Sequence, residues 1–95
     1  MFTVVHVITV ESSEAVDLTA TADSSIAAEQ PGIYRCSGNR ACHINVGGTA
    51  TQDVDLYLAA GEVVYLSVGA DESISAVQAN GETDGLLFVT RIRET

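Results

Sequence analysis

The fold of this chain is decided by residues 32–93, which read GIYRCSGNRACHINVGGTATQDVDLYLAAGEVVYLSVGADESISAVQANGETDGLLFVTRIR. Six short apolar runs in this stretch alternate with turns that contain Gly, Asn and Asp. The runs are rich in Val, Ile and Tyr, and β-branched and aromatic residues favour the pleated surface of a sheet. With the apolar segments nearer the N-terminus, they predict seven or eight strands at roughly ten-residue spacing. We therefore expect an all-β fold, a small antiparallel β-sandwich or jelly-roll-like barrel.

The first strands of this stretch, 33–37 and 41–46, flank Gly38-Asn39-Arg40, which predicts a hairpin because Gly and Asn accept positive φ at little cost. A three-residue loop pairs Cys36 with Cys42, whereas a two-residue loop shifts the register by one residue and scatters the apolar side chains. The three-residue loop is favoured because it gathers one apolar face from Tyr34, Cys36, Cys42, Ile44 and Val46.

Four more strands are expected at 53–59, 63–68, 73–79 and 86–92. In the first of them the side chains alternate. Val54, Leu56 and Leu58 share one face, and Asp53, Asp55 and Tyr57 share the other. In 63–68, Tyr65 stands opposite the apolar face of Val64, Leu66 and Val68. The strand at 86–92 is apolar on both faces, which is typical of a central strand.

The N-terminal residues differ in composition from the rest of the chain. Residues 2–10 are β-branched and apolar at both parities, so they predict a strand covered on both faces or an arm that docks on a neighbour. Residues 11–30 are rich in Ser, Thr, Ala and acids, with a strand at 15–20 and either a helical turn or a weak edge strand at 24–29. We divide the single domain into this arm and acidic segment, 1–30, and a β-sandwich core, 31–95.

Charge limits the partners of the chain. The net charge is −9, there is no lysine, and the only cations are Arg35, Arg40, Arg91 and Arg93. Nucleic acids and anionic membranes attract clustered positive charge, so neither is an expected partner. Hydrophobic residues make up 46% of a chain of only 95 residues, and a domain this small has a thin core. Some of its apolar surface is therefore expected to meet another protein.

Residues 2–10 lack the basic flank and the cleavage site of a secretory signal, and no apolar stretch reaches the length of a spanning helix. The expected product is a soluble protein made in the cytosol, where thiols stay reduced. Cys36 and Cys42 are accordingly expected as buried free thiols, with a strained disulfide across the hairpin as the alternative.

The sequence holds no strong signal for chemistry. Cys36, Cys42 and His43 fail as a metal site because adjacent strand residues point to opposite faces, and His6 is remote in sequence. A calcium site would draw on scattered acids, for which a solvated face is the simpler interpretation; they are Asp53, Asp55, Asp71 and Glu72. No nucleophile elbow or phosphate-binding loop is recognisable. We expect no enzyme, no cofactor and no metal.

The candidate functional residues are therefore those of an interface. Tyr57 and Tyr65 are expected to point outward from neighbouring strands, which suits a protein interface or, less well in a chain so poor in aromatics, a sugar-binding face. The apolar arm and the two C-terminal cations complete the set of candidates: Phe2, Val4, Val5, Val7, Arg91 and Arg93.

The residues from 32 to 92, about two-thirds of the chain, resemble small β-structured virion proteins of tailed bacteriophages, of the capsid decoration, cement or head-fibre type. The resemblance rests on these segments: Tyr34-Arg35-Cys36, Cys42-His43-Ile44-Asn45-Val46-Gly47, Ala50-Thr51, Tyr57-Leu58-Ala59-Ala60-Gly61-Glu62, Tyr65-Leu66-Ser67-Val68, Ile74-Ser75-Ala76-Val77-Gln78-Ala79 and Leu87-Phe88-Val89-Thr90. It implies a protein on the outer capsid surface that binds the major capsid protein, assembles as a trimer or dimer and stabilises the shell. It carries over no catalytic residue. The alternative is a carbohydrate- or receptor-binding module of a fibre or tail.

Overall fold

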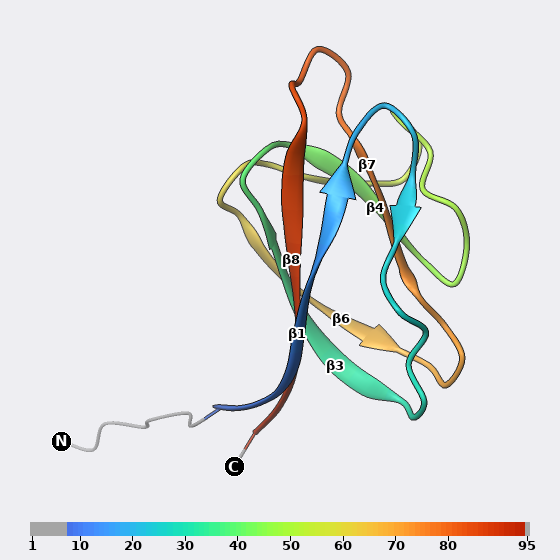
Figure 1. Cartoon of the computed structure of the whole chain (residues 1–95), viewed down its shortest axis with the longest axis vertical. Helices are drawn as coiled ribbons and strands as arrows, with labels where there is room; N and C mark the ends of the chain where they lie inside the picture. Colours follow the sequence, from blue (N-terminus) through green and yellow to red (C-terminus); the bar gives the residue numbers. More distant parts are fainter. Residues whose placement is uncertain (1–7, 95) are drawn as a thin grey trace, which may run out of the picture.

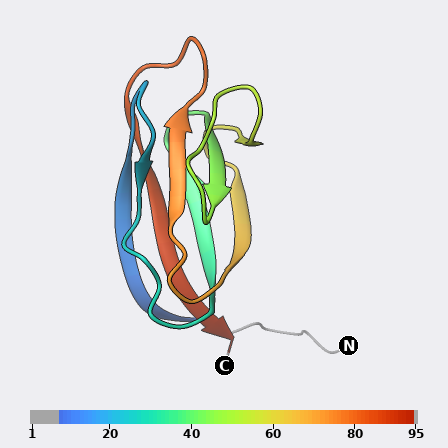
Figure 2. The ribbon, with the colours of Figure 1, turned by 90° about the vertical axis from the view of Figure 1, so that its right-hand side faces the viewer.

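The computed structural model describes residues 8–94 and shows an all-β sandwich of two antiparallel four-stranded sheets. Figure 1 shows how the strands are arranged, and Figure 2 looks from the side, with β7 and β4 in front of the other sheet. The strands are β1 (Ile8–Leu18), β2 (Asp23–Ser24), β3 (Gly32–Gly38), β4 (Cys42–Val46), β5 (Leu56–Leu58), β6 (Val63–Val68), β7 (Ile74–Gln78) and β8 (Gly85–Glu94). Within the described residues, no helix could cross a membrane.

Strand pairing gives the sandwich the topology of a jelly roll. We call the sheet with strand order β1-β8-β3-β6 sheet A and the sheet with order β2-β7-β4-β5 sheet B. β1 pairs with β8, β2 with β7, β3 with β6 and β4 with β5, all antiparallel. The chain is thus a long double ribbon, with its tip between β4 and β5, wound into two sheets. The predicted fold class is confirmed.

β1 is longer than predicted and belongs to the sandwich. It pairs with β8 from Ile8 to Leu18, with a bulge between Val10 and Ser12, and the predicted strand at 15–20 is the end of it. Val16 and Leu18 are 2% and 0% exposed and lie in the core. The division at residue 30 therefore does not separate an arm from a core within the described residues. Segment 24–29 is neither a helix nor a full strand, because β2 ends at Ser24.

The predicted hairpin between β3 and β4 is wrong. Cys36 pairs with Val64 of β6 and Val89 of β8, while Cys42 belongs to sheet B. The Gly38-Asn39-Arg40 segment carries the chain from one sheet to the other, and the Asn39 backbone and side chain both bond to Leu86. The predicted shared face is nevertheless correct, because alternate residues face the core whichever strand lies beside them. These residues are Tyr34, Cys36, Cys42, Ile44 and Val46.

The predicted strand at 53–59 shrinks to β5. Asp53 has a φ of 63°, and the Asp55 carboxylate accepts the Thr51 N–H at 2.7 Å, so this part folds as a turn. Val54 consequently lies 77% exposed instead of in the core, and of its predicted face only Leu58 is buried. The strand at 63–68 is confirmed as β6, and β8 is central in sheet A, as its two apolar faces predict.

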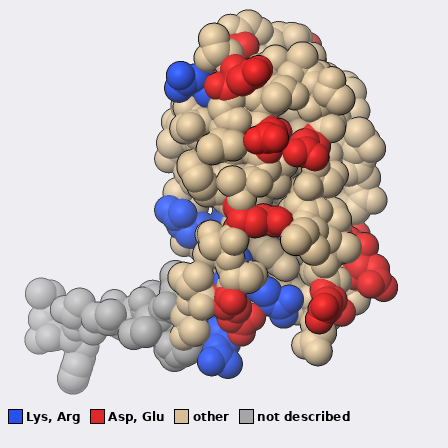
Figure 3. Space-filling model, viewed as in Figure 1, with Lys and Arg blue, Asp and Glu red and all other residues tan. Residues whose placement is uncertain are grey.

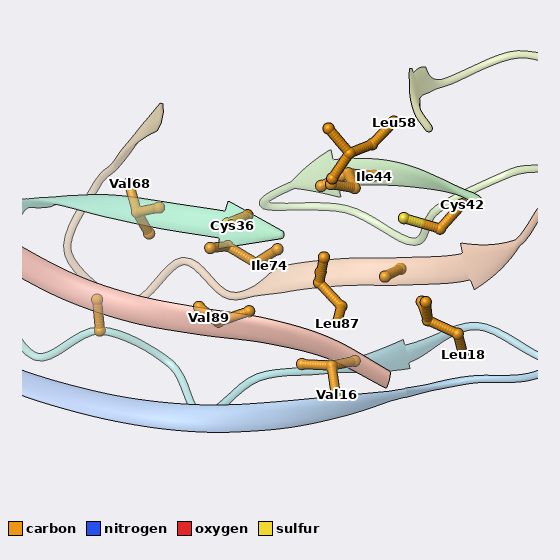
Figure 4. Close-up of a cluster of buried hydrophobic side chains, with 12 residues drawn as sticks. Val16, Leu18, Cys36, Cys42, Ile44, Leu58, Val68, Ile74, Leu87 and Val89 are labelled. Atoms are coloured by element: carbon orange, nitrogen blue, oxygen red, sulfur yellow. The ribbon is translucent and has the colours of Figure 1, made fainter. Parts of the chain in front are cut away.

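The core between the sheets is built from small and medium apolar side chains of both layers (Figure 4). Its fully buried members include Val16, Leu18, Cys36, Val68, Leu87 and Val89 from sheet A and Cys42, Leu58, Ile74 and Ala76 from sheet B. Both cysteines are free thiols, as the cytosolic argument predicts. Desolvation in this core raises the pKa of Cys36 to about 12 and that of Cys42 to about 11.

Candidate functional site: two exposed apolar surfaces

The outer face of sheet B is covered by the chain itself. Residues 47–55 fold over β4 and β7, and Ser75 and Val77 on that face are only 1% and 3% exposed. The Ala50 N–H donates to Ser75 Oγ at 2.9 Å, and Gln52 Nε2 donates to the Gln78 carbonyl at 2.7 Å. This loop covers the outer face of β4 and β7, whereas Tyr57 of β5 stays exposed on the same side.

His43 anchors the covering loop with both ring nitrogens. The ring is 6% exposed, and Nδ1 lies 3.0 Å from the carbonyl oxygen of Asp55, so Nδ1 carries the proton and donates it. Nε2 then accepts the Asp53 N–H at 3.3 Å, and the ring centroid lies 5.5 Å from that of Tyr57. With both nitrogens engaged, His43 has a structural role.

Replacing His43 by alanine should release this loop. The substitution removes two hydrogen bonds and a buried ring, so the free energy of unfolding should fall by roughly 1–2 kcal/mol. Amide exchange at residues 50–55 should quicken about tenfold relative to β8, because the opening is local. Tyr57→Ala, which keeps both bonds, is the control. Equal exchange of the loop in both variants would show that His43 does not anchor it.

Sheet A presents an open apolar face to solvent. Ile33, Val63, Tyr65 and Phe88 are 46%, 39%, 53% and 45% exposed. Strand register places Ala15 and Phe88 side by side, with Ser37 and Val63 continuing the same row. We call this surface the sheet A face; its apolar members are Ala15, Ile33, Val63, Tyr65, Leu86, Phe88 and Ile92. Exposed apolar side chains gathered on one face are a typical feature of interaction surfaces, so this face is a candidate functional site.

A second apolar surface lies at the edge of sheet B. Val54, Leu56 and Tyr57 are 77%, 50% and 54% exposed, and β5 is the end strand of its sheet. We call these three residues the β5 patch. Asp53 and Asp55 flank it in the turn before β5, so the patch is apolar at its centre and acidic at its margin.

Tyr57 and Tyr65 do not share a surface, contrary to the prediction. β5 and β6 belong to different sheets, and each tyrosine points outward from its own sheet. The two rings therefore lie on opposite faces of the sandwich and cannot grip one ligand together. The sequence places them side by side because consecutive strands with a short turn usually form a hairpin, whereas this turn crosses between layers.

Arg91 has a structural role: its side chain bonds to other parts of the chain. Its Nε donates to Glu11 at 2.9 Å, and its two terminal nitrogens donate to the carbonyls of Gln30 and Pro31, each at 3.1 Å. Arg93 Nε lies 3.5 Å from the same Glu11 carboxylate. The neighbouring Tyr34 side chain and, after it, the Glu11 carboxylate raise the pKa of Arg91, so the guanidinium stays charged. These contacts tie β1 and β8 to the segment that enters β3.

A groove of about 420 Å³ opens beside this cluster, between β1 and residues 26–29. It exists because β2 is only two residues long and leaves the edge of the sandwich uncovered. Glu14 crosses its mouth and accepts the Ile26 N–H at 2.8 Å. Figure 3 faces this edge and shows acidic side chains spread over it, with arginines at its margin and lower end. Most of the charged groups that line the groove form hydrogen bonds or ion pairs with other parts of the chain.

Within residues 8–94, no cluster of three His, Cys, Asp or Glu side chains could hold a metal ion. The candidate arm residues Phe2, Val4, Val5 and Val7 lie outside the described residues. The sequence did not predict Ile33, Val63 and Phe88 as surface residues; the only signal was for Phe88, on the second apolar face of 86–92. The chain gives no significant match in comparisons with protein-family models, curated proteins or solved structures.

Proposed function

We propose that this protein is a virion structural protein of a tailed bacteriophage that binds the outside of the capsid shell and stabilises it. The observation that carries the proposal is the pair of exposed apolar surfaces on an otherwise acidic jelly roll. A protein with such surfaces works by contact. The jelly roll recurs in viral capsid domains, but also in lectins and enzymes, so the fold alone does not give a function.

The β5 patch is the surface that docks on the major capsid protein. It lies exposed at the edge of sheet B, and it combines an aromatic side chain with two aliphatic ones, the composition of an interface centre. The acidic residues beside it, Asp53 and Asp55, suit a basic rim on the partner. Single contacts of this size are weak, and a symmetric shell multiplies them through avidity.

The charge distribution supports a place outside the shell. The chain has 13 acids and 4 arginines, and Arg91 and Arg93 are engaged with Glu11. Such a protein is repelled by packaged DNA, whose binding requires free clustered cations. The sugar-binding alternative loses its main argument, because Tyr57 and Tyr65 lie on opposite faces of the sandwich.

Co-sedimentation with expanded empty shells of the major capsid protein tests this function. The wild-type protein should pellet with the shells at saturation in a fixed ratio to the capsid subunits. The triple substitution Val54→Ser, Leu56→Ser and Tyr57→Ser should weaken binding at least about tenfold, since it removes the apolar centre of the interface. Ile26→Ser is the matched control, because Ile26 is 82% exposed and lies at the groove instead.

Two results would count against the proposal. A wild-type protein that stays in the supernatant at every shell concentration contradicts shell binding itself. A triple variant that binds like the wild type, with Ile26→Ser also unchanged, contradicts the assignment of the β5 patch.

A further inference from the structure

The charged residues of the sheet A face are arranged so that two copies of the face are complementary to each other. Asp17 and Arg35 are the charged side chains that point outward from this face, among the side chains that the structure describes. Neither makes a hydrogen bond or an ion pair within residues 8–94, whereas Glu11 and Arg91 on the inner side are paired. Among the side chains that the structure describes, the face thus carries one positive and one negative charge, in a chain of net charge −9.

Strand register fixes where these charges stand. Asp17 pairs with Leu86, two residues before Phe88 on the strand beside it. Arg35 pairs with Thr90, two residues after Phe88 on the strand at the other side. A strand spacing of ~4.8 Å and a rise of ~3.4 Å per residue put each of them about 8 Å from Phe88, in opposite directions. Phe88, which is 45% exposed, therefore lies midway between them.

We propose that the sheet A face is the interface of a two-fold symmetric dimer of this chain, with Phe88 at its centre. A two-fold axis that lies in the interface, through Phe88 and perpendicular to the line from Asp17 to Arg35, brings Asp17 of one copy opposite Arg35 of the other, twice. Such an interface is isologous: if one residue meets another across it, the reverse contact also forms.

The resulting geometry is one that packed sheets adopt. The line from Asp17 to Arg35 is inclined to the strands by roughly 35°, so the strands of the two copies cross at roughly 70°, near the orthogonal class of sheet packing. Two of the hydroxyl groups on the face are already paired, since those of Ser13 and Thr90 lie 3.3 Å apart. The contact leaves the β5 patch free at the other side of each sandwich, so the dimer does not depend on shell binding.

Analytical ultracentrifugation of the full chain, without shells, tests this dimer by charge exchange. Asp17→Arg and Arg35→Glu should each weaken self-association about 10- to 100-fold, because each places like charges opposite one another twice. The double variant, Asp17→Arg with Arg35→Glu, should restore the dimer to within about threefold of the wild type. Glu29→Arg reverses an acid beside the groove and is the control, expected to leave the dimer unchanged.

Circular dichroism of each variant separates loss of the dimer from loss of the fold. A wild-type chain that stays monomeric up to about 1 mM, or forms a trimer, overturns the proposal. So does a folded double variant that associates no better than the single variants, because the charges then do not face each other. Shell binding is read in a different experiment, so either proposal can fail alone.

Discussion

Replacing Leu18 by alanine should lower the free energy of unfolding by about 3 kcal/mol, which for a domain of this size shifts the melting temperature by roughly 15 °C. Leu18 is 0% exposed and lies in the core opposite sheet B. It is the last residue of β1, and its two neighbours in sequence are polar. The cavity cannot be filled by β2, because that strand is only two residues long. Chemical denaturation followed by circular dichroism measures the change.

Leu56→Ala provides a control of identical chemistry. Leu56 is 50% exposed at the end of sheet B, so its truncation should cost less than about 1 kcal/mol. Equal effects of the two substitutions would mean that β1 is not a core strand, and that the segment before residue 30 is an appendage after all.

The two core thiols should be almost inert in the folded protein. Alkylation requires the thiolate, and the pKa of about 12 for Cys36 and about 11 for Cys42 lies well above the ordinary value of 9.0. At pH 8, labelling by iodoacetamide should be slowed about a thousandfold at Cys36 and about a hundredfold at Cys42, and loss of access slows it further. Mass spectrometry should find both thiols labelled only after denaturation. Rapid labelling of either one without denaturant would contradict their burial.

The same pKa values give the thiols a signature in the pH dependence of stability. In the unfolded chain they lose their protons as the pH passes 9.0, whereas in the folded protein they keep them until about 11 and 12. The unfolded state then binds fewer protons, so stability falls above pH 9, by roughly 1 kcal/mol per thiol at pH 10. Cys36→Ala should lose less stability between pH 8 and 10 than the wild type.

The sequence predicts this fold from alternation, and alternation is local. The sequence correctly predicts which side chains of β6 face the core, because a strand turns alternate side chains to the core in any sheet. They are Val64, Leu66 and Val68. For the same reason Cys36 and Cys42 are correctly assigned to one core although their pairing is wrong. A turn such as Gly38-Asn39-Arg40 has the same residues whether it closes a hairpin or crosses between layers. The pairing partners are decided by long-range contacts that the local pattern does not contain.

The candidate surfaces were only partly predictable for the same reason. Tyr65 and Tyr57 are recognisable as outward residues, but the sheet to which each belongs is a property of the topology. Phe88 becomes a surface residue only once Leu87 and Val89 are known to fill the core. The Arg91 to Glu11 pair joins residues 80 positions apart, and nothing in either neighbourhood predicts it.

Under the two proposals, the protein would be a small adaptor that works by contact. One side, the sheet A face, would join two copies through an apolar interface. The other side, the β5 patch, would then be presented twice by each dimer, which strengthens attachment to a repetitive shell without any new contact. The acidic remainder of the surface would keep free dimers apart in solution.

Under the proposal, a tailed bacteriophage encodes this protein, and the most direct test is to locate the protein in purified virions of that phage. Electron cryomicroscopy of wild-type particles, with mass spectrometry of their proteins, should find the jelly roll on the outside of the capsid in register with the shell lattice, its β5 edge against the major capsid protein. Virions that lack the protein, or that carry it only at the tail or fibres, would contradict a role in stabilising the capsid.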